Sequence, residues 1–258
     1  MERINTRKPR GLTSMGIRTW GMIFLALGIV GRAVFQNHLL GLSQLSTSEL
    51  LDAMQNSDQM MLYATIALIL QAVETCAVPI FAYLLVEGFT HTSDYGKYLI
   101  RVGLVAVVSE IPFNLCMSGN FIDAGSRNPV FSMVLGLVIL YFYRRYEERS
   151  FKNFFVKAAV TFAGIFWAYI LRIEAASSVV IIVAVLWAAR KKPNFRNMLG
   201  CAAAISCCLI STLYLVAPMS FMIIHFYNGE KGEGNRGVNY AAYPIFLVAA
   251  VLAIRFLL

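Results

Sequence analysis

One stretch of the sequence indicates the fold: Pro79-Ile-Phe-Ala-Tyr-Leu-Leu-Val-Glu-Gly-Phe-Thr-His-Thr92. It is an apolar run, typical of a membrane segment, that ends in Glu87 and His91. If the run is helical, these two residues share one face, one turn apart, and the carboxylate can hold the imidazole in one tautomer. Two interpretations stay open. The pair is either an acid/base pair facing a cytoplasmic cofactor or a helix-end pair that bonds Thr92 or Lys97.

The composition of the whole chain agrees with a membrane segment. Of 258 residues, 59% are hydrophobic and 14% are charged, and the mean hydropathy is +0.66. A soluble domain carries about 25% charged residues. We therefore predict an all-α polytopic integral membrane bundle of about 8–9 transmembrane helices. Residues 1–18 are expected to form a basic cytoplasmic tail, and residues 19–258 a single transmembrane domain.

The charge distribution predicts the orientation of the chain. The net charge is +8, and the basic residues fall between apolar segments, where the positive-inside rule accounts for them. Nucleic acid is therefore not an expected partner. The segment 36–60 contains no Lys or Arg and is predicted to lie outside, so that the N-terminus is cytoplasmic. The five cysteines have no CxxC spacing, so no metal site is expected.

The predicted spans are interrupted in two places. The apolar region 61–90 is too long for one upright helix, and Pro79 is expected to break or kink it. A span is predicted at about 198–216, followed by a short apolar piece at 219–227. Counting that piece as a broken span gives nine crossings, and omitting it gives eight. A short interfacial helix is predicted within 45–54.

Ionisable residues at membrane depth are the candidates for a polar site. A central charge costs about 2.5–3.5 kcal/mol on translocon scales. Arg32 and Glu74 lie on consecutive spans, and we predict that they form a buried ion pair. Arg172 and Glu174 are predicted to lie in a solvated outer turn.

Glu110 also lies at membrane depth, close to Pro112. Proline frees a carbonyl in its helix, and irregular backbone at this depth must line protein or water. Glu110 therefore either faces a substrate in a notch or belongs to a polar helix end that bonds Asn114.

Three motifs resemble the TraX family of polytopic bacterial membrane proteins. They are Phe81–Thr92, Lys97-Tyr-Leu-Ile-Arg101 and Ser109-Glu-Ile-Pro-Phe-Asn114. The family is named for the enzyme that acetylates the N-terminus of conjugative pilin. Shorter similarities lie in Asn128–Gly136, Tyr227–Gly232 and Tyr243-Pro244, so that the resemblance extends over about 70–258.

The resemblance implies a multi-pass acetyltransferase of the bacterial cytoplasmic membrane. Acetyl-CoA would be bound from the cytoplasm as co-substrate, and no metal would be needed. The acceptor would be a peptide N-terminus or another membrane-proximal molecule. His91, Glu87 and Glu110 would be catalytic. The CoA phosphates would be held by basic residues, because phosphates favour charge-assisted bonds: Arg101, Arg144, Arg145, Arg190, Lys191, Lys192 and Lys231.

The first span departs from the family pattern. Family members carry Asp-His-Ile-Gly there, whereas this chain has Gly28-Ile-Val-Gly-Arg-Ala-Val-Phe35. Glu174-Ala-Ala stands for the family's Asp-Tyr-Gly turn, and Phe246 stands where a histidine often follows Tyr-Pro. His91 is then the main remaining acid/base candidate. The alternative is a non-catalytic TraX-like binding or export component. Membrane lipid is an expected partner, and a homodimer is left open.

Overall fold

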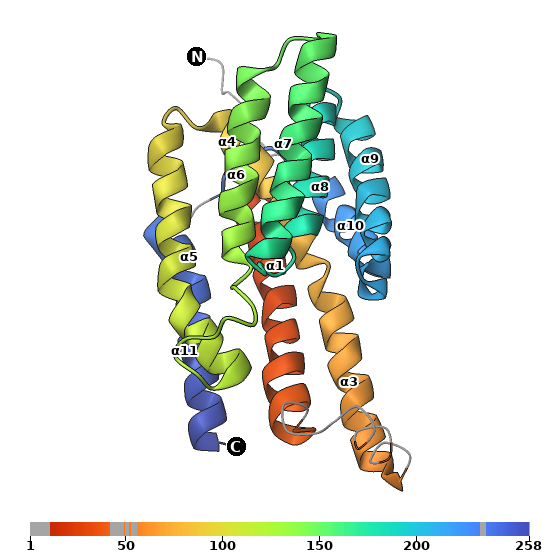
Figure 1. Cartoon of the computed structure of the whole chain (residues 1–258), viewed down its shortest axis with the longest axis vertical. Helices are drawn as coiled ribbons and strands as arrows, with labels where there is room; N and C mark the ends of the chain where they lie inside the picture. Colours follow the sequence, from red (N-terminus) through yellow and green to blue (C-terminus); the bar gives the residue numbers. More distant parts are fainter. Residues whose placement is uncertain (1–10, 42–48, 50–51, 53–55, 233–235, 258) are drawn as a thin grey trace, which may run out of the picture.

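The structure is a computed structural model that describes all residues except 1–10, 42–48, 50–51, 53–55, 233–235 and 258. Within the described residues the chain is a bundle of helices with isolated bridges in place of strands, which confirms the all-α prediction (Figure 1). Most of the predicted interfacial helix at 45–54 and the first ten residues of the predicted tail lie outside the described residues. Residues 14–18 of that tail already belong to the first helix.

The helical elements follow one another along the chain with short connections. In order they are α1 (Ser14–Ile29), η1 (Val30–Leu39), α3 (Asp58–Glu74), α4 (Ala77–His91), α5 (Tyr95–Ser118), α6 (Val130–Arg145), α7 (Phe151–Ile170), α8 (Ala176–Ala189), α9 (Pro193–Ser206), η2 (Cys207–Leu209), η3 (Thr212–Leu215), η4 (Ala217–Met219), α10 (Ser220–His225) and α11 (Arg236–Leu257).

The long apolar helices identify a membrane protein. Four helical segments are long and apolar enough to cross a bilayer, namely Ser14–Leu39, Asp58–His91, Tyr95–Ser118 and Phe151–Ile170. Large apolar side chains on their outer faces, such as Leu104 on α5 and Phe162 on α7, are more than half exposed. The remaining apolar helices are shorter, so the predicted count of eight or nine crossings is not confirmed.

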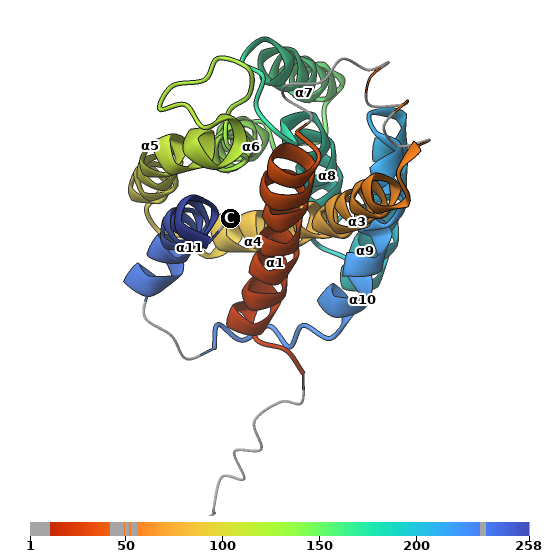
Figure 2. The same cartoon turned by 90° about the horizontal axis from the view of Figure 1, so that it is seen from below.

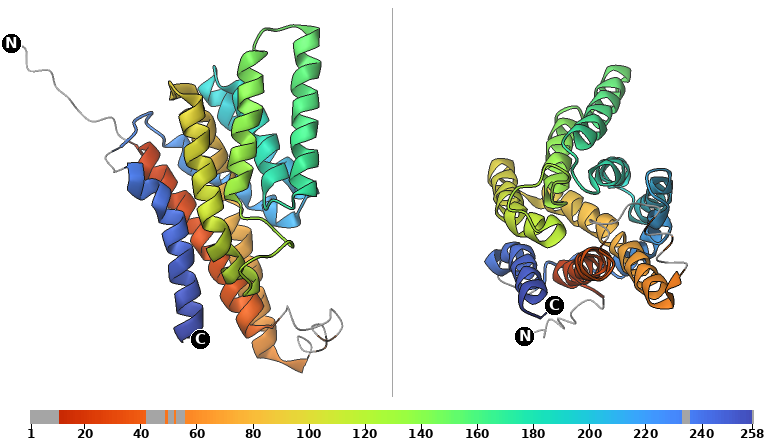
Figure 3. Two further views of the ribbon diagram at one scale, coloured as in Figure 1. Left: turned by 60° about the vertical axis from the view of Figure 1, so that its left-hand side comes forward. Right: turned by 60° about the horizontal axis from the view of Figure 1, so that its bottom comes forward.

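Helix α4 lies at the centre of the bundle. It contacts α1, α6 and α8, and most of its residues from Ala77 to Phe89 are buried (Figure 2). Helix α6 approaches it closely at Gly136, where an added Cβ would lie 2.7 Å from a side-chain carbon of Leu85. Helix α11 runs beside α5, and it ends at the opposite end of the bundle from the start of α1 (Figure 3).

The predicted break near Pro79 is confirmed. Helix α3 ends at Glu74, Thr75 and Cys76 form a turn, and α4 begins at Ala77. Pro79 has no N–H and its ring crowds the carbonyl of Thr75, four residues earlier, which disfavours a regular helix through Thr75.

The span predicted at 198–216 is wrong as a single helix. Helix α9 ends at Ser206, and three 3₁₀ turns follow before α10. The Ser211 side chain accepts a hydrogen bond from the N–H of Leu213 and so caps the second of these turns. We call residues 193–227 the re-entrant hairpin, because the chain enters and leaves the bundle at the same end. At its start Arg196 contacts Glu87, and at its end Tyr227 makes an edge-to-face ring contact with Tyr83, one turn before Glu87 on α4.

The tip of the re-entrant hairpin meets the break between α3 and α4. The Thr75 hydroxyl donates to the carbonyl of Leu213 at 3.2 Å, and the Cys76 thiol lies 3.3 Å from the carbonyl of Val216. Irregular backbone at membrane depth must find its partners within the protein. The two interruptions therefore stabilise one another inside the bundle.

Candidate functional site

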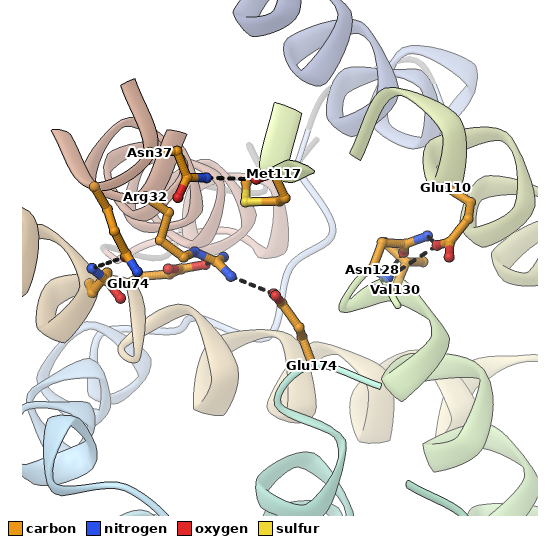
Figure 4. A network of polar contacts seen from close by, with 10 residues as sticks. Arg32, Asn37, Glu74, Glu110, Met117, Asn128, Val130 and Glu174 are labelled. Carbon is orange, nitrogen blue, oxygen red and sulfur yellow. Dashed lines mark hydrogen bonds and ion pairs between the residues drawn. The ribbon is translucent and has the colours of Figure 1, made fainter. Parts of the chain in front are cut away.

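The centre of the bundle holds an ion-pair triad formed by Arg32, Glu74 and Glu174. The Arg32 guanidinium donates from Nη2 to Oε1 of Glu74 at 2.6 Å and from Nη1 to Oε2 of Glu174 at 2.7 Å. Figure 4 shows the guanidinium between the two carboxylates. Each side chain is less than a quarter exposed. The predicted Arg32–Glu74 pair is confirmed, and a second carboxylate joins it.

The position of Glu174 corrects the prediction of a solvated turn. The turn between α7 and α8 places Arg172 and Ala175 at φ of 51° and 56°, a left-handed conformation that residues with a Cβ adopt rarely. Backbone hydrogen bonds to Arg127 hold this turn. The Arg127 N–H donates to the Arg172 carbonyl at 2.9 Å, and the Glu174 N–H donates to the Arg127 carbonyl at 3.1 Å. The tight turn directs Glu174 to Arg32.

Glu74 reaches Arg32 because Gly28 on α1 leaves room for it. A Cβ added at Gly28 would lie 2.0 Å from Oε2 of Glu74 and 2.4 Å from its Cβ. Arg32 itself lies in η1, a π-helical segment, and such segments are rare and frequently occur at functional sites. The Asn37 side chain donates to the Met117 carbonyl at 2.6 Å and fastens η1 to α5 (Figure 4).

Glu110 fastens the loop before α6 to α5. It accepts hydrogen bonds from the Asn128 side chain at 2.6 Å and the Asn128 N–H at 3.1 Å, and it pairs with Arg127 at 3.1 Å. The structural interpretation of Glu110 therefore holds with Asn128 as the partner, whereas the predicted bond to Asn114 is wrong. Through Arg127, Glu110 supports the turn that carries Glu174.

Two adjoining cavities lie inside the bundle. Cavity 1, of about 220 Å³, is lined by the triad together with Thr75, Ser211 and Tyr214. Cavity 2, of about 150 Å³, extends from Arg18, Tyr98 and Tyr240, near the first turns of α1, α5 and α11, inward to Tyr243. Four residues line both cavities: Leu25, Phe81, Pro129 and Met133.

The two cavities lie along α1 and η1, between Arg18 and Arg32. At 1.5 Å per residue this distance along the axis is about 20 Å. The two cavities, which share four lining residues, therefore lie in succession between one end of the bundle and the triad, and together we call them the internal passage.

The predicted Glu87–His91 pair lies at the end of the bundle where α4 terminates. The two residues share a face as predicted, with His91 Nδ1 3.8 Å from Glu87 Oε1 and 2.9 Å from the Glu87 carbonyl. The His91 side chain is 74% exposed. The Glu87 carboxylate instead lies 3.5 Å from Nη1 of Arg196, whose guanidinium stacks on Tyr83 and bonds its hydroxyl.

The structure does not bring the three predicted catalytic residues to one cavity. Neither cavity is lined by His91, Glu87 or Glu110. Glu110 lies 15 residues after Tyr95 on α5, which places it about 22 Å along the helix from the end where His91 lies.

The predicted cofactor-binding residues gather at the same end as His91. They lie at the end of α6 (Arg144, Arg145), after α8 (Arg190, Lys191, Lys192), early in α5 (Arg101) and in the loop beside Ser14 (Lys231).

Two of these cations are already paired. Arg190 and Lys191 both bind Glu147. The hydrogen bond from Lys191, together with the positive charges of Arg190 and Lys191, holds the pKa of Glu147 below its usual range. Arg101, Arg145 and Lys192 have no ion pair among the described residues. These three remain available to an anionic group.

Three residues of the internal passage were not predicted from the sequence to line it: Glu174, Arg18 and Tyr243. The signal for Glu174 was a charge directly before an apolar helix, because a carboxylate at membrane depth is expensive to leave unpaired. Arg18 was assigned to the basic tail. The Tyr243 residue is 6% exposed, its hydroxyl has no hydrogen-bond partner among the described residues, and nothing local in the sequence signals this.

The fold and the site define a helical membrane protein with a charged triad at the end of an internal passage. The family model described as TraX protein matches residues 49–254. The chain belongs to this family. The match begins after the first span, so Gly28 and Arg32 precede it. None of the curated proteins and none of the solved structures compared with the chain matches it.

Proposed function

We propose that this TraX family protein transfers an acetyl group from acetyl-CoA to a membrane-proximal acceptor. The internal passage is the observation that carries the proposal, because it leads from the end of the bundle with the free basic residues to a buried cluster of ionisable groups. Buried ionisable residues in a membrane segment are functional candidates by default.

The residues of the passage fit the chemistry of the donor. Arg18 stands at the outer end of cavity 2, and Arg101 lies one turn from Tyr98, which lines the same cavity. These cations suit the phosphates of CoA. The apolar walls formed by Leu25, Phe81 and Met133 suit a narrow thioester arm. The bound donor supplies an activated acyl group, and the protein orients it and excludes water.

The proposal includes an orientation and a location. The amino-terminal end would face the cytoplasm of a bacterium, where acetyl-CoA is available, in keeping with the basic residues that gather there. The acceptor, a peptide N-terminus or a small molecule, would reach cavity 1.

The proposal is tested by measuring acetyl-CoA binding to the purified protein and acetylation of an apolar peptide with a free amino terminus. Leu25→Trp should fill the junction of the two cavities and reduce binding at least tenfold. Leu27→Trp is the matched control, because Leu27 lies on the same helix with its side chain outward and 36% exposed. Absence of binding to the wild type, or equal binding by both variants, would refute the proposal.

A second function is favoured by one observation. His91, the principal acid/base candidate of the sequence, is 74% exposed and outside both cavities. A non-catalytic member that binds a substrate or an export partner would need only the passage. Acetyl-CoA binding without transfer to any peptide would favour this alternative.

A further inference from the structure

The triad carries more negative than positive charge. Two carboxylates, Glu74 and Glu174, share the single guanidinium of Arg32. With all three groups ionised the formal sum is −1 (two minus, one plus). An uncompensated charge away from water is costly, and two carboxylates that share a site cannot easily both stay ionised.

No other described cation compensates this charge. The charged and titratable groups that face the triad are Tyr214 from the hairpin tip and Tyr243 from α11, with Cys116 of α5 near Arg32. All three are neutral in their usual forms. Arg172 is the next cation along the chain, and its guanidinium points away to the carbonyl of Ala124 at 3.4 Å.

The carboxylates are also open to the cavity. Glu174 uses Oε2 for Arg32, and its side chain is 23% exposed. Both glutamates line cavity 1 together with the Thr75, Ser132 and Ser211 side chains. A molecule in the cavity can therefore exchange a proton with the pair.

We propose that the Glu74–Arg32–Glu174 triad holds one exchangeable proton and is the proton-transfer group of the site. This inference rests on the proposed acetyl transfer for its role in catalysis. The proton belongs to the pair of carboxylates, since groups this close titrate together. His91 is then not needed as the base.

The transfer step balances with the triad as the only proton carrier. A carboxylate accepts the proton of the attacking N–H or O–H of the acceptor as the acceptor atom forms a bond to the acetyl carbon. The carbon–sulfur bond breaks, and the electron pair leaves on the sulfur of CoA. The protonated carboxyl of the pair gives its proton to that sulfur, so that CoA leaves as the thiol and the triad again holds one proton, now on the carboxylate that accepted it.

The charge count predicts that removing either carboxylate of the triad also removes its proton. Glu74→Gln and Glu174→Gln each leave one carboxylate opposite Arg32, so that the remaining pair is neutral and needs no proton. Either single substitution should therefore abolish the proton, although each leaves one glutamate in place. Glu147→Gln is the matched control, because it removes a carboxylate that pairs with cations, Arg190 and Lys191, but lines neither cavity.

Infrared difference spectroscopy of the purified protein, without substrate, measures the proton directly. At about pH 6, where ordinary carboxylates are ionised, the wild type should show a protonated carboxyl band equivalent to one group per chain. The band should be lost in Glu74→Gln and in Glu174→Gln and kept in Glu147→Gln. A band that is absent from the wild type, or that survives both triad substitutions, would overturn the inference.

Acetylation of the free-amino-terminus peptide separates this inference from the proposed function. Each triad variant should bind acetyl-CoA but transfer at least about 100-fold more slowly, with a flattened pH profile. If the wild type shows the band but no acetyl transfer, the proposed function fails and the catalytic role fails with it, while the proton site stands. If the wild type transfers and the variants transfer equally well, the inference alone fails.

Discussion

The contact between α1 and α3 at Gly28 offers a sharp test of how the triad is held. In Gly28→Ala the new Cβ would lie 2.4 Å from the Cβ of Glu74, where ordinary contact begins at 3.4 Å, so the helices must separate by about 1.0 Å (3.4 − 2.4). The clash involves a Cβ that cannot rotate away, and the carboxylate is displaced as well. Overpacking costs about 1–3 kcal/mol.

The same displacement weakens the 2.6 Å bond between Arg32 and Glu74. Breaking a buried ion pair costs about 3–5 kcal/mol. We therefore expect Gly28→Ala to lower the free energy of unfolding by at least about 3 kcal/mol.

The assay is denaturant unfolding of the purified protein in mixed micelles, with Gly103→Ala as the control. Gly103 lies in α5, and a Cβ there meets nothing within 4 Å. Alanine is more favourable than glycine in a helix by about 0.5–1 kcal/mol, so the control should be as stable as the wild type or slightly more stable. Equal unfolding free energies for the two variants would refute the close approach of α1 and α3.

Three further predictions test the surrounding elements. Asn128→Ala removes the side-chain hydrogen bonds to the Ala106 carbonyl at 2.8 Å and to Glu110 at 2.6 Å. It should lower the free energy of unfolding by about 1–3 kcal/mol in the same assay. An unchanged stability would contradict the role of Glu110 in holding the loop before α6. Ala175→Gly relieves the left-handed backbone at φ 56° and should stabilise the fold by up to about 1 kcal/mol, whereas a loss of stability would show that this turn is not strained. His91→Ala should change the unfolding free energy by no more than about 0.5 kcal/mol, because the side chain is 74% exposed, and should leave acetylation of the peptide intact; loss of acetylation at unchanged stability would return the catalytic role to His91.

Much of the fold follows from the sequence because its causes are local. The apolar runs are long enough to define helices, and the missing N–H of Pro79 favours the break that separates α3 from α4. The Arg32–Glu74 pair was predictable because an isolated charge at that depth is expensive, so that two opposite charges on consecutive spans point to one another.

The parts that could not be predicted depend on contacts between distant segments. The segment predicted as a span at 198–216 is interrupted where it contacts the break at Thr75 and Cys76. The contact partners, Leu213 and Val216, lie about 140 residues away along the chain. Glu174 reaches the triad only because Arg127 fixes the turn that carries it. Such pairings leave no periodic pattern in the sequence.

The catalytic residues proposed from the sequence show the same limit. The four-residue spacing of Glu87 and His91 correctly placed them on one face, but spacing cannot say whether that face lines a cavity or meets solvent. The partner of Glu87 is Arg196, which the sequence places 109 residues later.

We propose that acetyl-CoA enters the internal passage with its acyl end toward the triad. The most direct test uses an acyl-CoA that carries a photoreactive acyl group, followed by mapping of the adducts by mass spectrometry. We expect adducts on Leu25, Phe81 or Met133, and their suppression by excess acetyl-CoA. Adducts confined to the exposed surface around residues 87–91 and 190–192, or labelling that excess acetyl-CoA leaves unchanged, would contradict it.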